Sequence, residues 1–176
     1  MSSQKKRFTL VEILMVTGMI CLIAALIVVA YNGVYRSWSS KNTIATMKAA
    51  HLALDRYMLE NGSYPTETSK KTLENVSGKS VKLAKELLQD CAPYSKADGS
   101  KTKVFDDFGK EIDIYYVYPA KDSNSFALIS DGKDGIPNTD DDIIYLPAGN
   151  KTLKPGFYIG KTTDDGSVSD TEPLAQ

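Results

Sequence analysis

The sequence predicts an α+β fold in which one long N-terminal helix packs on a small antiparallel β-sheet. An almost wholly apolar run from Phe8 to Tyr31 predicts the first half of the helix, and an amphipathic pattern that continues to Asn61 predicts the second half. The sheet is predicted by β-branched and aromatic segments that recur from Ile112 to Gly160 between turn residues. A chain of 176 residues has room for one modest globular core beside such a helix.

The apolar run is long enough to cross a membrane. A bilayer core takes about 20 apolar residues, and there the backbone must satisfy its own hydrogen bonds as a helix. Lys5, Lys6 and Arg7 precede the run, and a basic flank marks the cytoplasmic end. A cleaved secretory signal is the alternative, but its apolar region is shorter, about 7–15 residues. We therefore expect a leader over residues 1–7 and a retained membrane segment over residues 8–35.

The helix is expected to continue over residues 36–61 as an amphipathic half that packs on the globular domain. Its apolar side chains recur at helical spacing, at Ile44, Met47, Leu54 and Met58. Asn61-Gly62 supplies a C-terminal stop. His51 lies within this stripe, and because no nucleophile or second histidine accompanies it, we expect a packing residue rather than a catalytic one.

Residues 62–161 are expected to form the globular domain. The segment from Thr66 to Val104 reads as a long connection that contains one short helix, from Ser80 to Gln89. Four strands are predicted after it, in residues 112–119, 125–130, 143–146 and 156–160, with a hairpin turn at residues 121–124. Residues 162–176 are acidic with few large apolar side chains, which predicts a disordered tail.

The net charge and the positions of the cysteines argue against a nucleic-acid partner and against an intrachain disulfide. The net charge is -1 and no basic patch lies outside the leader, so a nucleic-acid partner is not expected. Cys21 falls within the membrane segment and Cys91 in the globular domain, so the two cannot form a disulfide within one chain. We expect Cys91 to be a half-buried free thiol.

An acidic loop between two predicted strands is the strongest candidate for chemistry. Its five carboxylates are offset by Lys133 alone and belong to Asp131, Asp134, Asp140, Asp141 and Asp142. Such a cluster repels itself unless a cation lies among the oxygens, and hard oxygen ligands suit Ca²⁺. The spacing is not that of an EF-hand, and zinc is disfavoured because no His or Cys lies nearby. A solvated turn without a metal stays equally open. A glycosidase pair is disfavoured because the carboxylates lie together on one turn rather than across a cleft.

Four segments resemble a known family. The N-terminal KRFTLVEILMV is similar to the signature of the type IV pilin-like superfamily. LDRYMLENGSYPTE (residues 54–67), VFDDFGKEI (residues 104–112) and ISDGKDGIPNTDDDI (residues 129–143) most resemble the major pseudopilins of type II secretion systems. The resemblance covers roughly residues 5–67 and 104–145.

The resemblance implies how the N-terminus is processed and used. Prepilin peptidase would cut between Arg7 and Phe8 on the cytoplasmic side, and the new amino group of Phe8 would be methylated. Glu12 then becomes the fifth residue of the mature chain, where the family pairs a glutamate with the N-terminal amine of a neighbouring subunit. An ammonium at the same depth offsets the cost of a lone carboxylate in lipid.

The resemblance also implies a bound Ca²⁺ ion. Its side-chain ligands would be Asp134, Asp141 and Asp142. Backbone carbonyls near Asp131 and Ile136 would complete the shell.

A structural subunit rather than an enzyme is the implied function. It would be a single-pass protein of the bacterial inner membrane with its globular domain in the periplasm, and it would polymerise into a pseudopilus that drives protein secretion. Minor pseudopilins and an inner-membrane assembly platform would be its partners. A pilin of a surface or DNA-uptake pilus, or a membrane-anchored calcium-binding module that never polymerises, are the alternatives.

The chain departs from the family pattern at several places. Arg7 stands where the family strongly prefers Gly before the cut, and this leaves cleavage at Arg7-Phe8 open. Phe108 stands where Trp is common, and Asn138 where Gly is usual, although Asn tolerates the left-handed conformation. The chain after Leu146 is longer than expected for a major pseudopilin, which leaves room for a different pilus-like system.

Overall fold

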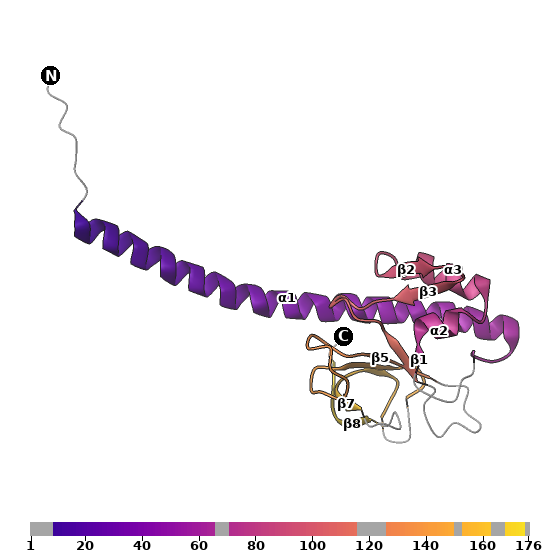
Figure 1. Ribbon diagram of the computed structural model, residues 1–176. Helices are drawn as coiled ribbons and strands as arrows, with labels where there is room; N and C mark the ends of the chain where they lie inside the picture. Colours follow the sequence, from indigo (N-terminus) through magenta and orange to yellow (C-terminus); the bar gives the residue numbers. More distant parts are fainter. Residues whose placement is uncertain (1–8, 66–70, 116–125, 150–152, 163–167, 175–176) are drawn as a thin grey trace. The chain divides into compact units, whose positions relative to one another are not determined.

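The computed structural model describes residues 9–65, 71–115, 126–149, 153–162 and 168–174. The chain divides into two units, Met1–Trp38 and Ser39–Gln176, and helix α1 (Leu10–Asn61) contributes to both. The predicted α+β class is confirmed, with a long N-terminal helix and antiparallel sheets (Figure 1). The remaining elements are β1 (Lys71–Thr72), α2 (Leu73–Ser77), α3 (Val81–Asp90), β2 (Ser95–Asp98), β3 (Lys101–Val104), β4 (Asp113–Tyr115), β5 (Ala127–Ser130), β6 (Ile143–Leu146), β7 (Gly156–Thr162) and β8 (Val168–Pro173).

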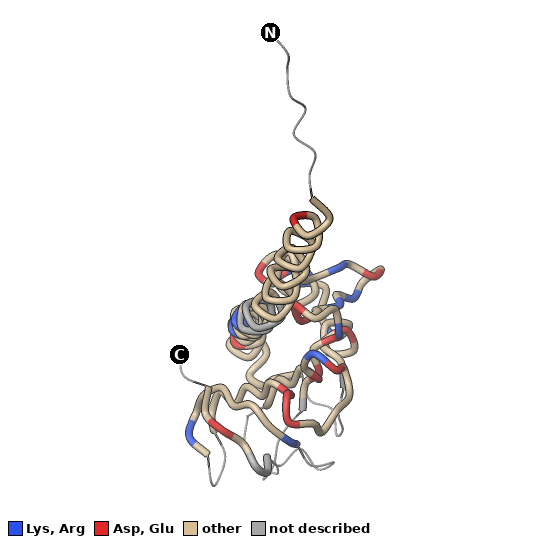
Figure 2. The backbone as a smooth tube through the Cα atoms, turned by 90° about the vertical axis from the view of Figure 1, so that its left-hand side faces the viewer, with Lys and Arg blue, Asp and Glu red and all other residues tan. Residues whose placement is uncertain are grey.

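Among the residues that the structure describes, one helical stretch is long and apolar enough to cross a membrane, Leu10–Tyr31 in the first unit. Its large apolar side chains are exposed in the single chain, so lipid or other helices must cover them. Figure 2 shows this part of α1 almost free of charge, with one acidic residue, Glu12, near its start. The predicted membrane segment is therefore helical over its described residues.

The second half of α1 supplies the helical side of the globular core. Met47 and Leu54 are fully buried, and Ile44 and Met58 pack against the same cluster, which confirms the predicted stripe. The helix ends at Asn61, where Gly62 adopts φ +76° and donates its N–H to the Met58 carbonyl over 2.7 Å. This left-handed cap is the stop that Asn61-Gly62 predicts.

Six strands form one antiparallel sheet in the order β1-β4-β5-β6-β7-β8. Alternate residues of β5 and its approach point to opposite faces: Phe126 and Leu128 join the cluster under α1, and Ala127 and Ile129 join a second cluster. Both faces of the sheet therefore bury apolar side chains. The four predicted strands each overlap a strand of this sheet, whereas the predicted turn at residues 121–124 lies outside the described residues.

The connection between α1 and the sheet holds more structure than the sequence predicts. The predicted short helix is α3, and Ser80 takes the extended backbone of an N-cap, although its side chain makes no capping hydrogen bond. Strand β1, helix α2 and the β2–β3 hairpin were not predicted. The hairpin is rich in Lys and Ser and has no apolar alternation on β2, so its stability comes from pairing across the Asp98–Lys101 turn and from contacts with α2 and α3.

The prediction of a disordered tail over residues 162–176 is wrong for residues 168–174, and residues 163–167, 175 and 176 lie outside the described residues. Strand β8 pairs with β7 over Val168–Pro173, with a register shift at Gly160/Lys161. The Leu174 N–H donates to the Phe157 carbonyl over 3.0 Å, and the Leu174 side chain packs on the main core cluster. Backbone pairing and one apolar anchor thus order a segment whose polar composition favours disorder.

His51 links α1 to the sheet through a chain of polar contacts. Its Nδ1 lies 2.8 Å from the Tyr145 hydroxyl, and its Nε2 lies 3.2 Å from Asp55. Asp55 in turn accepts a hydrogen bond from the Tyr64 hydroxyl over 2.6 Å. The His51 ring also meets Phe126 and Tyr145 edge-on. The histidine is therefore a packing residue, as predicted, with two polar partners.

Two neighbouring leucines of α1 test the contribution of this packing. Leu54→Ala removes a fully buried side chain and should lower the free energy of unfolding by about 2–5 kcal/mol, because a cavity remains. Leu52→Ala, the matched control, removes a side chain that is 56% exposed and should change it by about 0.5 kcal/mol or less. Urea unfolding of the full chain in detergent, followed by circular dichroism, measures both. Equal losses would show that this face of α1 does not hold the core.

Candidate functional site

The acidic loop is held at its base by the sheet. Strands β5 and β6 flank it, and the ladder pair Ser130–Ile143 closes it over residues 131–142. The Asp142 carbonyl oxygen accepts a hydrogen bond from the N–H of Gly160 on β7, over 3.1 Å. The predicted location of the loop between two strands is confirmed.

Three residues with positive φ curl the loop. Gly132 has φ +63°, Gly135 +65° and Asn138 +67°. A Cβ at position 132 would lie 2.4 Å from the Asp141 carbonyl oxygen, so the backbone there passes too close for any side chain. Asn138 adopts the left-handed conformation expected of an asparagine in place of a glycine.

The hydroxyl of Thr139 lies among four oxygens of the loop. Carboxylate oxygens of Asp141, Asp142 and Asp134 are 2.9, 3.2 and 3.4 Å from its Oγ1. The Ile136 carbonyl oxygen is 3.1 Å away. A hydroxyl has one proton to donate, so Thr139 can satisfy only one of these four acceptors at a time. The loop therefore gathers four oxygens around one neutral hydroxyl.

Burial places two carboxyl groups of the loop, those of Asp142 and Asp131, in unfavourable surroundings. Asp142 is fully buried, and this burial, with the neighbouring Asp131, outweighs the hydrogen bonds from Asn138 and Thr139 and raises the Asp142 pKa to about 6. Asp131 has a buried Oδ1 that finds no hydrogen-bond partner among the described residues. A nearby cation would relieve both groups, because it favours the ionised form.

The predicted metal-site residues are brought into one loop, but they do not form an open chelating group. Across the described residues, no three His, Cys, Asp or Glu side chains are placed to hold a metal ion. Asp141 instead accepts the Lys133 N–H over 2.8 Å, and Asp134 accepts the Ile136 N–H over 2.8 Å. The Ile136 side chain points outward and is 57% exposed, so its carbonyl is the part that faces the loop interior.

Asp106 anchors the loop from a neighbouring turn and was not among the predicted site residues. It is buried and accepts N–H groups of Phe108 and Lys110, at 3.0 and 2.8 Å, and the Ser130 hydroxyl at 2.6 Å. Burial raises its pKa despite these hydrogen bonds. The burial of Asp106 follows from tertiary packing, which the sequence does not reveal. Thr139 could have been identified from the sequence, because its hydroxyl stands among the acidic residues of the loop.

A second predicted site lies at the start of α1. The Glu12 carboxylate accepts the Thr9 N–H over 3.4 Å, and the Thr9 hydroxyl accepts the Glu12 N–H over 3.3 Å. This is a capping box, which occupies the Glu12 carboxylate in the single chain. Arg7 and Phe8, the predicted processing residues, lie outside the described residues.

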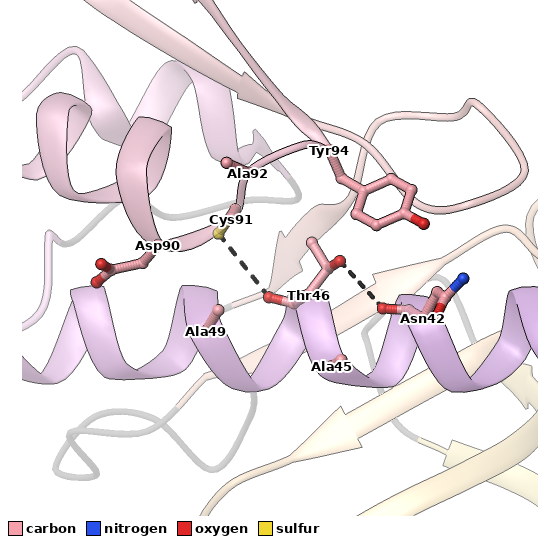
Figure 3. Close-up of a pocket in the computed structure, with 8 residues that line it drawn as sticks. All are labelled: Asn42, Ala45, Thr46, Ala49, Asp90, Cys91, Ala92 and Tyr94. Carbon is pink, nitrogen blue, oxygen red and sulfur yellow. Dashed lines mark hydrogen bonds between the residues drawn. The ribbon is translucent and has the colours of Figure 1, made fainter.

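Cys91 lies beneath a small cavity between α1 and the segment after α3. Its thiol points toward α1 and contacts the Thr46 carbonyl oxygen at 3.9 Å (Figure 3). The thiol is buried, more so than the predicted half-burial, and it forms no disulfide. Burial, with a smaller contribution from Asp90, raises the Cys91 pKa to about 12.

Comparison with known proteins places these features in one family. The family model for protein G of the type II secretion system matches residues 34–145, which include the second half of α1 and the acidic loop. The type II secretion system core protein G of Klebsiella michiganensis is 30% identical over 155 residues, 87% of this chain and 98% of that protein. The core protein G of Escherichia coli K12 is 29% identical over 142 residues, 81% of this chain and 91% of that protein. No solved structure matches the chain significantly.

The burial of Cys91 predicts an inert thiol. In a Cys21→Ala chain at pH 8, Cys91 should react with iodoacetamide roughly 1000-fold more slowly than a free thiol, because the raised pKa lowers the thiolate fraction. The sign follows from the shift: the neutral thiol favours the fold, so this contribution to stability is present below pH 9 and is lost as pH rises toward 12. Mass spectrometry of the alkylated chain measures the rate, with urea-unfolded protein as the reference. Labelling at the unfolded rate would contradict the burial.

Proposed function

The chain belongs to the protein G family of the type II secretion system, the family of the major pseudopilin, and we propose how this subunit is processed, assembled and stabilised. As a member it is a structural subunit of the pseudopilus, not an enzyme. The family match over residues 34–145 is the observation that carries this conclusion. It also decides between the predicted alternatives, in favour of a secretion pseudopilin over a pilin of a surface or DNA-uptake pilus.

The single apolar helix suits a subunit that waits in a membrane before assembly. We propose that the membrane is the bacterial inner membrane and that the globular unit lies in the periplasm, because Lys5, Lys6 and Arg7 precede the span. Copies of the chain would polymerise through their apolar helices, in contact with minor pseudopilins and an inner-membrane assembly platform. The exposed apolar side chains of Leu10–Tyr31 give such a polymer its contact surface.

Processing by prepilin peptidase between Arg7 and Phe8 would create the charge that Glu12 needs. A carboxylate in lipid costs about 3 kcal/mol, and a Phe8 ammonium from a neighbouring chain would offset both charges. The capping box with Thr9 is long, at 3.3 and 3.4 Å, and exposed. Glu12 can therefore leave its cap for a charged partner at little cost.

A Ca²⁺ ion would supply the positive charge that the acidic loop lacks. The donors are all oxygens, as Ca²⁺ prefers: carboxylates of Asp134, Asp141 and Asp142, with carbonyls of Asp131 and Ile136. The crowded Thr139 hydroxyl and the unpartnered Asp131 Oδ1 support the proposal. Side chains must turn from their present hydrogen bonds toward the ion, because the carboxylates of Asp134, Asp141 and Asp142 converge on the Thr139 hydroxyl and not on a position open to a metal.

Replacement of Glu12 tests the assembly role. Glu12→Ala should abolish filaments in cells that assemble the wild type, while membrane insertion and the methylated Phe8 N-terminus, read by mass spectrometry, stay intact. Thr17→Ala is the matched control, since its hydroxyl bonds only within α1, to the Ile13 and Leu14 carbonyls. Normal filaments from the Glu12 variant would refute the pairing, and an uncleaved leader would refute processing at Arg7.

Thermal unfolding of the full chain in detergent tests the metal. Wild-type stability should rise by about 2.7 kcal/mol when free Ca²⁺ reaches roughly 100 times its Kd. Asp134→Ala with Asp142→Ala should remove the difference between Ca²⁺ and chelator. Asp140→Ala should keep it, because the Asp140 side chain is 86% exposed and pairs with Lys161 instead. Equal melting of the wild type with and without Ca²⁺ would disprove the site.

A further inference from the structure

One line of α1 side chains in the globular unit is left exposed by the described residues. Lys41, Ala45, Lys48 and Leu52 are all exposed and lie at spacings of three and four residues, which places them on one side of the helix. Leu59 continues the line and is 85% exposed. Neither lysine has a carboxylate within ion-pair distance in the described residues, and Lys48 lies over the Phe157 ring at 5.3 Å. We call this line of five residues the α1 stripe.

A small cavity opens beside the α1 stripe. Figure 3 shows it between α1 and the segment after α3, with Ala45 and Ala49 on the helix side and Ala92 and Tyr94 opposite. Its volume is about 140 Å³, and a cavity of about 150 Å³ accepts a molecule the size of benzene. Asn42, Thr46, Asp90 and Cys91 complete the lining, and the Asp90 carboxylate is paired with Arg56 at 2.7 Å. The small alanine side chains leave space for one branched aliphatic group, and Ala45 joins the cavity to the lysines on either side of it.

The acidic loop of the same chain carries the complementary features. Ile136 is 57% exposed on the outer side of the loop, between Asp134 and Asp140. Three lysines lie in or against the loop: Lys133 belongs to it, Lys161 pairs with Asp140 at 3.3 Å, and Lys110 packs over Gly135. The five carboxylates outnumber these ammonium groups, so the loop is acidic in the metal-free chain. An aliphatic side chain on an acidic loop thus matches a small, partly apolar cavity beside two lysines that have no carboxylate partner in the described residues.

We propose that the acidic loop of one subunit docks on the α1 stripe of a second copy, with Ile136 entering the cavity at Ala45. The inference rests on the proposed function, since it assigns one contact within the pseudopilus. The two surfaces are different parts of the same chain, so the contact is heterologous and propagates into an open polymer instead of closing as a dimer. Lys41 and Lys48 then gain carboxylate partners across the contact.

Disulfide cross-linking in filaments of the full chain tests the contact. Oxidised filaments of an Ala45→Cys, Ile136→Cys chain should give a ladder of dimers, trimers and higher species on a non-reducing gel, because each copy carries both halves of the contact. All variants carry Cys21→Ala, because Cys21 is exposed on the apolar helix. Each variant with only one of the two introduced cysteines should give no ladder, since Cys91 is buried. The matched control replaces Ile136→Cys with Asp98→Cys, an exposed position on the β2–β3 hairpin. Filaments that form without a ladder, or that cross-link equally through position 98, overturn the proposal.

A charge exchange provides the second measurement if the cysteine variants fail to assemble. Lys48→Glu should reduce filament yield several-fold, and Lys48→Glu combined with Asp140→Lys should restore at least half of it. No loss in the single variant, or no recovery in the pair, overturns the contact. Absence of filaments from the wild-type chain under assembling conditions would instead contradict the proposed function, so the two failures are distinguishable.

Discussion

Burial of one face of α1 is the constraint on which the globular unit depends. The strands of the main sheet have two to seven residues, and strands this short are not stable without a partner layer. Met47, Ala50 and Leu54 supply that layer, and they are fully buried under the sheet and the α2–α3 segment. The sheet in turn positions the acidic loop, because the pair Ser130–Ile143 closes it. Packing of the helix therefore determines where the loop carboxylates lie.

The elements with strong periodicity were predictable from the sequence. The apolar run, the Met47–Leu54 stripe and strand β6 at Ile143–Leu146 each carry a hydrophobic pattern that matches the structure. The β2–β3 hairpin and β8 were not predictable by this route, because most of their residues are polar and their order comes largely from pairing with other strands. Local composition gives no information about such tertiary pairing.

The candidate metal site also has features that the sequence predicts and features that it does not. Its acidic composition and its place between two strands were evident from residues 130–143. The central position of Thr139 and the burial of Asp142 were not, since both depend on how Gly132 and Asn138 fold the loop back on itself. The anchoring of Ser130 by Asp106 joins residues 24 positions apart, which spacing within one motif does not predict. The sequence thus indicated which loop carries the acidic residues, and the structure shows that three of them surround Thr139.

The polar chain from Tyr145 through His51 and Asp55 to Tyr64 sets the angular orientation of α1 within its unit. Aliphatic contacts are not directional, so a helix held by them alone can turn slightly about its axis without losing much burial. Hydrogen bonds of 2.6 and 2.8 Å at the two ends of this chain oppose such a rotation, because each depends on direction as well as distance. The residues on the outer side of α1 are thereby presented at one fixed azimuth. A repeating assembly needs this uniformity, since an angular error in each subunit would accumulate along a polymer.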